Sequence, residues 1–137
     1  MRIAFLSILT AATMFAADGP TIKQVPLKQT SPVDGKAMFS MYCAVCHGAD
    51  GKGNGPAAPA MKHSPGDLTK MTINNKGKFP DERIAMSIVG SSGIAAHGND
   101  QMPIWGDLFK SVSNDNSIIR LRISNLTDYI KSIQTKK

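Results

Sequence analysis

The chain has 137 residues and a formal net charge of +6 at pH 7, which indicates one small domain whose core is marginal unless a tightly bound cofactor adds stability. The lysines are scattered and do not alternate with aromatic residues, which argues against nucleic-acid binding. A basic surface of this kind favours attraction to acidic partner proteins.

The first 17 residues have the layout of a secretory signal peptide. Arg2 gives a positive start, residues 3–15 are apolar but too short to span a bilayer comfortably, and two small alanines precede the polar Asp18. We therefore expect residues 1–17 to be removed on export, which predicts a periplasmic protein without stable membrane insertion. An uncleaved membrane anchor is the alternative interpretation of this segment.

Residues 18–31 contain prolines and no periodic pattern, so we expect an extended N-terminal leader, with the folded domain at residues 32–137. Ser31 and Pro32 are typical of a helix start, because serine caps free N–H groups and proline suits the first helical position. The sequence predicts a helix from Pro32 into the cysteine cluster.

The middle of the chain alternates between loops and one short helix. Residues 48–60 are so rich in glycine and proline that a regular helix is excluded, and packing against a large bound group would explain how they are ordered. A helix is predicted for residues 81–89, because acidic residues open it and Gly90 ends it. Residues 90–103 again resemble a loop. The apolar side of the short helix is expected to consist of Ile84, Met86 and Ile88.

The last segment gives the clearest helical pattern. Apolar residues recur every three or four positions and form one stripe, and Asn114 or Asp115 could cap the helix. No convincing alternation of polar and apolar residues is present, so we expect an all-α architecture. The stripe consists of Ile119, Ile123, Leu126, Ile130 and Ile133.

The strongest motif is Cys-Ala-Val-Cys-His at residues 43–47. Two thiols three positions apart on a helical turn can each bond one vinyl group of the same haem, and the adjacent imidazole can then reach the iron. The motif therefore predicts one haem c, attached covalently through Cys43 and Cys46, with His47 as an axial ligand.

Three other interpretations of the two cysteines are open. A thioredoxin-like dithiol would need a βαβ setting, and a zinc site would need two more ligands from His63 and His97, whose spacing is unusual. A structural disulfide across two residues is possible but strained. Export supports haem, because this kind of attachment takes place outside the cytoplasm.

Beyond this motif, the chain resembles the class I cytochromes c over residues 32–134. The similar elements occur in the order of that family: GKAMF, YCAVCHG, the glycine-rich DGKGNGP, the loop QMPIW, and a closing helix that contains YI. The resemblance implies a cytochrome c fold, in which terminal helices pack together and short helices and long loops surround the covalently bound haem.

The resemblance also implies particular contacts. Gly35 and Phe39 of the first helix are expected to lie near Tyr129 of the last helix. The carbonyl of Pro56 is the expected acceptor of a hydrogen bond from the ligand His47, a contact that would orient the imidazole and raise its basicity. Apart from the resemblance, the type of side chain suggests that Trp105 covers the haem edge, donates its N–H to a propionate, or packs in the core.

The family places its second axial ligand in a Met-Pro element, which implies Met102 because Pro103 follows it. His97 is the alternative ligand, although such a histidine is more often exposed or bonded locally. The other methionines of the domain are interpreted as core or spacing residues; these are Met38, Met41, Met61, Met71 and Met86.

The resulting function is one-electron transfer without enzymatic activity. A His/Met pair would raise the reduction potential relative to two histidines, which suits a carrier between periplasmic or membrane-bound respiratory partners. Lysines around the haem edge would steer redox partner proteins with acidic docking surfaces. The alternatives are an enzyme or gas sensor with an open iron position, and a binding module without haem.

Overall fold

The computed structural model describes residues 29–90 and 105–136 of the chain. Regular structure in these two stretches is helical, and neither contains a strand, so the expected all-α class is confirmed. The expected signal peptide at 1–17 and most of the expected leader lie outside the described residues.

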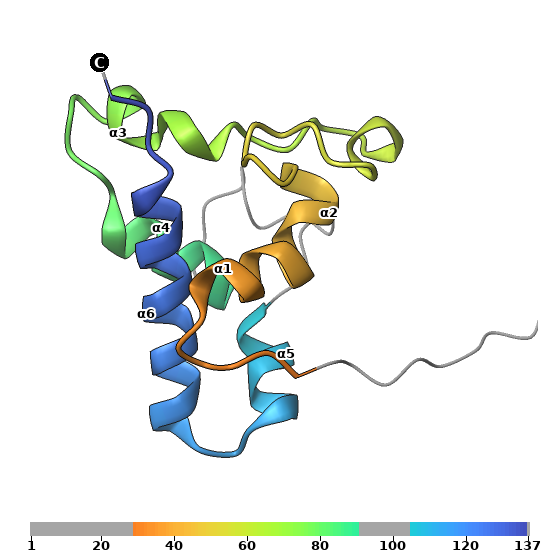
Figure 1. Cartoon of the computed structure of the whole chain (residues 1–137), viewed down its shortest axis with the longest axis vertical. Coiled ribbons are helices and arrows are strands. Elements are labelled where there is room, and N and C mark those ends of the chain that lie inside the picture. The colour runs from red at the N-terminus through yellow and green to blue at the C-terminus, as the bar shows by residue number, and fades with distance from the viewer. Residues whose placement is uncertain (1–28, 91–104, 137) are drawn as a thin grey trace, which may run out of the picture.

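The longest helix, α6, lies along one side of the molecule, and α1, α4 and α5 pack against it (Figure 1). The described elements are α1 (Gly35–Met38), the π-helical turn η1 (Phe39–Cys43), α2 (Ala44–His47), the 3-10 turns η2 (Ala58–Ala60) and η3 (Leu68–Lys70), α3 (Met71–Asn74), α4 (Asp81–Val89), α5 (Trp105–Val112) and α6 (Asn116–Ser132).

The first helix begins later than the sequence predicts. The side chain of Asp34 accepts a hydrogen bond of 2.8 Å from the backbone N–H of Ala37, so Asp34 and not Ser31 caps the helix, and α1 starts at Gly35. The carbonyl of Ser31 instead accepts the N–H of Asp34 at 3.3 Å in a preceding turn. An acidic cap satisfies one of the free N–H groups of the first turn.

A π-helical turn joins α1 to the cysteine motif. The N–H of Ala44 donates to the carbonyl of Phe39, five residues earlier, so the helix is widened between α1 and α2. Phe39, Tyr42 and Cys43 point into the core, whereas Met41 is 44% exposed. Of the two interpretations of Met41, the core residue is excluded and the spacing residue is left.

The expected contact between the first and last helices is confirmed. The rings of Phe39 and Tyr129 lie 5.2 Å apart. A side chain at Gly35 would collide with the carbonyl oxygen of Asn125 and approach Cβ of Tyr129 to 2.9 Å, so only glycine allows α1 to cross α6 this closely. This crossing fixes the helix that carries the cysteine motif.

The predicted helices at residues 81–89 and near the C-terminus are also confirmed. Gly90 ends α4 in the left-handed conformation, and the carboxylate of Asp115 caps α6 by accepting the N–H of Ser117 at 2.7 Å. Met86 is 37% exposed, so its predicted place on the apolar side of α4 is wrong. Of the α6 stripe, Ile119, Leu126 and Ile130 are buried, and Ile123 and Ile133 are half-buried.

Helix α5 was not anticipated from the sequence. It packs against α4 and α6, and its Phe109 is almost completely buried. A Cβ at Gly106 would lie 2.7 Å from the carbonyl oxygen of Val89, so α5 approaches the end of α4 closely. Trp105 is half-buried and packs against the hydrophobic core, which agrees with the core alternative for this residue.

Candidate functional site

The cysteine motif forms the last turns of the first helical segment. Cys43 ends η1, Cys46 and His47 belong to α2, and both cysteines are free thiols. Residues three positions apart are neighbours on a helix surface. The structure therefore brings two thiols and an imidazole together within a single stretch of helix, as covalent haem attachment requires.

The alternative uses of the cysteines gain no support from the described part of the chain. The thiols form no disulfide. No group of three or more metal-binding side chains lies within residues 29–90 and 105–136, and the strands that a βαβ setting needs do not occur there. His97, one of the possible zinc ligands, lies outside the described residues.

The environment of Cys43 favours an uncharged sulfur. Burial, with a smaller contribution from the charge on Cys46, raises the pKa of the Cys43 thiol to about 12. A thiolate is disfavoured at such a site, whereas a thioether carries no charge and needs no hydration. The buried sulfur position thus fits a thioether bond to haem, and the half-buried Cys46 and His47 next to it complete the attachment group.

The imidazole of His47 is oriented by a backbone carbonyl. Its Nδ1 lies 3.1 Å from the carbonyl oxygen of Gly66, which can only accept, so Nδ1–H is the donor of this hydrogen bond. The expectation that Pro56 supplies this carbonyl is therefore wrong. A metal-binding histidine usually donates its other N–H in this way, which fixes the tautomer and the ring plane.

The glycine-rich loop pairs with the backbone of the motif. The N–H groups of Gly53, Gly55 and Ala57 donate to the carbonyls of His47, Cys46 and Val45, at 2.7, 3.1 and 2.9 Å. The carbonyls at the C-terminal end of a helix have no partner within the helix. The loop satisfies three of them and holds the motif in place.

Glycine is required where this loop leaves the helix. Gly48 follows His47 with a φ of +80°, which side chains disfavour, and a Cβ there would collide with the side chain of Asn54. A Cβ at Gly55 would lie 2.5 Å from the carbonyl oxygen of Val45. The loop is rich in glycine because at Gly48 and Gly55 the backbone leaves no room for a side chain as it passes the cysteine motif.

The C-terminal residues fix the other end of the loop. Nε2 of Gln134 donates to the carbonyl of Leu68 at 2.7 Å, and Oε1 accepts the N–H of Thr72 at 2.8 Å. The N–H of Thr135 donates to the carbonyl of Thr69 at 2.9 Å. Since Gly66 lies two residues before Leu68, the residues that follow α6 help to hold the carbonyl that orients His47.

Met102, the expected second axial ligand, lies outside the described residues, as does its rival His97. The structure does describe the start of α5, which follows Met102 after Pro103 and Ile104. Trp105 at that start lies against Tyr42, which directly precedes Cys43, with a distance of 5.4 Å between ring centroids. The start of α5 is therefore linked by an aromatic contact to the helical segment that carries the cysteines.

Sequence reasoning did not identify Gly66, Gln134 and Tyr42 as supporting residues. Gly66 and Gln134 act through contacts between distant segments, for which the sequence carries no local signal. Tyr42 could have been identified from its position directly before Cys43. A bulky aromatic side chain next to a cysteine that binds a cofactor is expected to pack against the elements around that cysteine.

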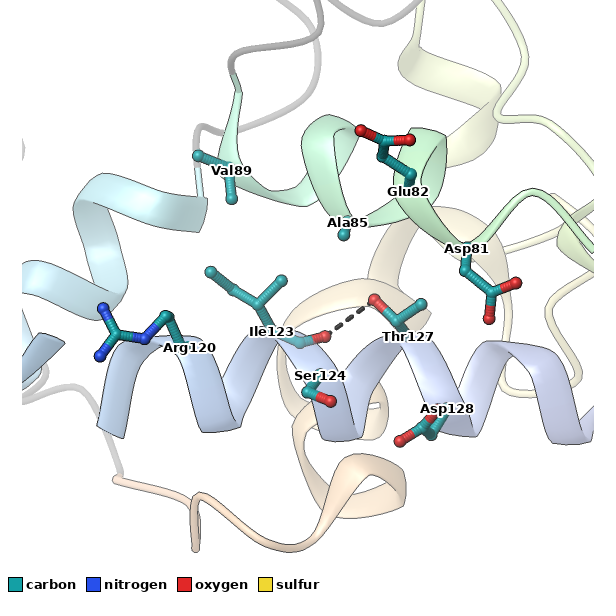
Figure 2. A pocket seen from close by; sticks show the side chains of 9 residues that line it. All are labelled: Asp81, Glu82, Ala85, Val89, Arg120, Ile123, Ser124, Thr127 and Asp128. Atoms are coloured by element: carbon teal, nitrogen blue, oxygen red, sulfur yellow. Dashed lines mark hydrogen bonds between the residues drawn. The ribbon is translucent and has the colours of Figure 1, made fainter. Parts of the chain in front are cut away.

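A separate groove runs between α4 and α6 (Figure 2). Its floor is apolar, and carboxylates gather near one end with Arg120 near the other; the lining residues are Asp81, Glu82, Ala85, Val89, Arg120, Ile123, Ser124, Thr127 and Asp128. The groove uses the side of α6 opposite to the one that packs on α1, and none of the cysteine-motif residues lines it.

Within residues 29–90 and 105–136, no helix has the length and apolar character needed to cross a membrane. Comparison with curated proteins and with solved structures found no match. The sequence family described as cytochrome c matches residues 32–109, which is more than half of the chain and includes the cysteine motif. The chain therefore belongs to the cytochrome c family, binds haem c covalently and takes part in haem-based electron transfer.

Proposed function

We propose that this protein is an exported one-electron carrier in which Cys43 and Cys46 bind the haem and His47 and Met102 are the axial ligands. The bound haem supplies an iron that alternates between the ferric and ferrous states. The observation that carries the proposal is the CxxCH motif, in which the two thiols form no disulfide and the histidine donates Nδ1–H to the carbonyl of Gly66. The hydrogen bond leaves Nε2 as the nitrogen that can bind iron.

A thioether from Met102 would complete the iron coordination. Met102 is followed by Pro103, which stiffens the chain, and then by α5, which packs against α4 and α6. With both axial positions filled, no substrate needs to coordinate the iron, which supports a carrier and not an enzyme. The His/Met pair would also raise the reduction potential above that of a bis-histidine haem.

Acidic redox partners are proposed from the charge of the chain. The net charge is +6, and exposed lysines lie both within the glycine-rich loop that contacts the haem motif and along the segment that follows it. These lysines are Lys52, Lys62, Lys70, Lys76 and Lys78. Such a surface accelerates encounter with an acidic partner and allows quick release, as a carrier requires.

Export to the periplasm is proposed from residues 1–17, whose charged start, apolar centre and small residues are typical of a cleaved signal. The mass of the purified protein would test this, because removal of the signal and addition of haem both change it. A mass that includes the signal would favour a retained anchor.

The central experiment is to produce the full chain for export together with the haem-attachment machinery, and to record spectra of both redox states with and without carbon monoxide. We expect a low-spin spectrum with a weak red sulfur-to-iron band, which Met102→Ala abolishes and His97→Ala leaves unchanged. Carbon monoxide should not alter the spectrum of the unmutated protein. A high-spin spectrum that shifts with carbon monoxide would instead indicate an open iron position and refute the carrier.

A further inference from the structure

The groove between α4 and α6 carries opposite charges at its two ends. Asp128 lies near one end, Arg120 lies near the other, and Ser124 lies between them (Figure 2). All three side chains are exposed. Within residues 29–90 and 105–136, neither Arg120 nor Asp128 forms an ion pair. The groove therefore offers two charges of opposite sign that can pair with groups on another molecule.

The three residues form one row along α6. They are spaced by four positions, and residues four apart are neighbours on the same face of a helix. At a rise of about 1.5 Å per residue, Arg120 and Asp128 are roughly 12 Å apart along the helix axis, with Ser124 halfway between them. The two ends of the row are thus equally distant from Ser124 and opposite in charge.

Such a row is complementary to a second copy of itself. If two α6 helices cross in opposite directions at Ser124, a two-fold axis through the crossing places Arg120 of each copy beside Asp128 of the other. In a two-fold interface every contact between different residues occurs twice. Rows of residues four apart are also the ridges that pack into the grooves of a neighbouring helix. The small side chain of Ser124 lets the two helices approach closely at the crossing.

Apolar side chains surround this row. Ala85, Val89 and Ile123 form the floor of the groove and are half-buried. Met86 of α4 is 37% exposed and Leu121 of α6 is 38% exposed, and each lies one turn from a residue that lines the groove. Exposed apolar side chains around an apolar groove are typical of a protein interface. Methionine suits such a surface because its side chain adapts to the shape of a partner.

We propose that the protein forms a homodimer through this groove, in which the two α6 helices cross at Ser124 and two reciprocal ion pairs join Arg120 to Asp128. The groove faces away from the side of α6 that packs on α1, and no residue of the cysteine motif lines it. The interface therefore leaves the cysteine motif of each copy uncovered. The inference concerns a surface outside the haem site and does not depend on the identity of the second axial ligand.

The net charge of the chain opposes this association. Two copies with a net charge of +6 each repel each other at long range. At an ionic strength of about 0.15 M the Debye length is about 8 Å, so repulsion between distant charges is largely screened. Charges in contact within an interface are screened much less. The association is therefore measured at this ionic strength.

The experiment is sedimentation equilibrium of the haem-loaded protein, which gives the dissociation constant of the dimer. Arg120→Asp and Asp128→Arg each replace both ion pairs by pairs of like charge, which should raise this constant at least about tenfold. The chain that carries both substitutions has the opposite charges restored and should dimerise again. Mixing the two single variants should give a mixed dimer, because both pairs then again join opposite charges.

Lys110→Asp and Asp107→Arg are the matched controls. They change the net charge by the same amounts, but both residues are exposed on α5, outside the groove, and pair with each other at 3.0 Å. Because breaking an exposed ion pair costs little stability, both variants should fold. They should leave the dissociation constant of the dimer nearly unchanged. The absorption spectra of all variants should match that of the unmutated protein, which shows that the haem site is intact.

Three results would overturn the inference. If the protein stays monomeric at about 1 mM, the dimer is refuted and the groove is left for a partner of another kind. If the protein dimerises but Arg120→Asp and Asp128→Arg weaken the dimer no more than the α5 controls do, the interface lies elsewhere. If the two single variants stay monomeric when mixed, the reciprocal pairing is wrong. None of these results affects the proposed function, which the absorption spectra test separately.

Discussion

Gly55 and Gly66 belong to the same loop but have opposite surroundings. A Cβ at Gly55 would lie 2.5 Å from the carbonyl oxygen of Val45 and 2.6 Å from that of Cys46, and neither backbone atom can move without disturbing the haem motif. A Cβ at Gly66 would have nothing within 4 Å, although the carbonyl of this residue bonds His47. Gly55 therefore has no room for a side chain, whereas Gly66 has room for one and contributes its carbonyl to the site.

Substitution by alanine separates these two cases. Gly55→Ala should lower the free energy of unfolding of the holoprotein by about 2–4 kcal/mol, because it overpacks the motif and weakens the bond from its N–H to Cys46. Gly66→Ala should be neutral or stabilise by up to about 1 kcal/mol, because only the unfolded chain is restricted. Urea denaturation followed by haem absorbance measures both, and equal losses would contradict the described loop path.

Asp67 gives the segment after Gly66 a dependence on pH. Hydrogen bonds from the side chain and backbone N–H of Thr69, at 2.6 and 2.9 Å, together with Lys70, hold the pKa of the Asp67 carboxyl below its usual value. The unfolded chain then binds more protons than the folded chain near this pKa. The stabilisation is therefore present above the unfolded pKa and is lost as the pH falls through the folded one.

Asp67→Asn should accordingly be less stable than the unmutated protein at neutral pH, and the difference should shrink as the pH falls below about 3.9, the unfolded value. Thermal unfolding of both proteins across the acid range measures this difference. A gap that stays constant or grows in acid would show that Asp67 does not act through its charge. Asp107→Asn, which removes an exposed carboxylate paired to Lys110 on α5, is the control.

At the scale of elements, the end of α6 acts on a segment far from it in sequence. Gln134 bridges the carbonyl of Leu68 and the N–H of Thr72, and Thr135 bonds the carbonyl of Thr69. The C-terminal helix thus does more than cross α1, because the residues that follow it, Gln134 and Thr135, bond the segment just after Gly66.

Gln134→Ala should lower stability by about 1–3 kcal/mol, since it leaves a partly buried carbonyl and N–H without these partners. The effect should be local: amide hydrogen exchange at Thr72 should accelerate much more than exchange within α4. Lys136→Ala, two residues later and exposed, should change neither quantity. Uniform acceleration across all helices would contradict a local role for the C-terminal contact.

The elements that the sequence predicted are those with strong local signals. Helix α6 has a continuous apolar stripe, and α4 has acidic residues at its start and Gly90 at its end. The start of α1 was misplaced because Ser31 and Pro32 form a plausible cap, whereas Asp34 makes the actual bond. Helix α5 is short and was missed, because its stability depends on close packing against α4 at Gly106.

In the candidate site, too, residues with a local sequence signal were predicted and residues that depend on tertiary contacts were not. Cys43, Cys46 and His47 were predicted from a motif whose chemistry is local. The contact of Gly35 and Phe39 with Tyr129 followed from a family resemblance. The acceptor for His47 was assigned to Pro56 and proved to be Gly66, because the identity of that carbonyl depends on how the whole loop returns. The assignment of Met102 stays a prediction.

For the molecule as a whole, opposite charges are unevenly distributed. Carboxylates of Asp81, Glu82 and Asp128 gather near one end of the groove between α4 and α6, and Asp81 is paired to Lys131 at 2.7 Å (Figure 2). Exposed lysines predominate on the segment between η2 and α4. Surface ion pairs such as this one contribute little to stability. We therefore expect the uneven distribution of charge to affect the rate at which the protein encounters charged partners.

Electron transfer with small reagents of opposite charge tests this consequence. Oxidation of the reduced holoprotein by the hexacyanoferrate(III) anion should slow several-fold as ionic strength rises from about 0.01 to 0.1 M, because the Debye length falls from about 30 to 10 Å and screens the attraction. Oxidation by a cationic cobalt(III) complex should accelerate over the same range. The signs follow from the net charge, which is +6 for the whole chain, falls to +5 when Arg2 leaves with the signal, and remains positive after the two haem propionates are added. Stopped-flow rates are measured with both reagents on the same protein. An effect of salt on the haem itself would change both rates in the same direction, whereas screening changes them in opposite directions. If both rates fall together, salt acts on the fold or the potential, and steering of acidic partners by the lysine surface is refuted.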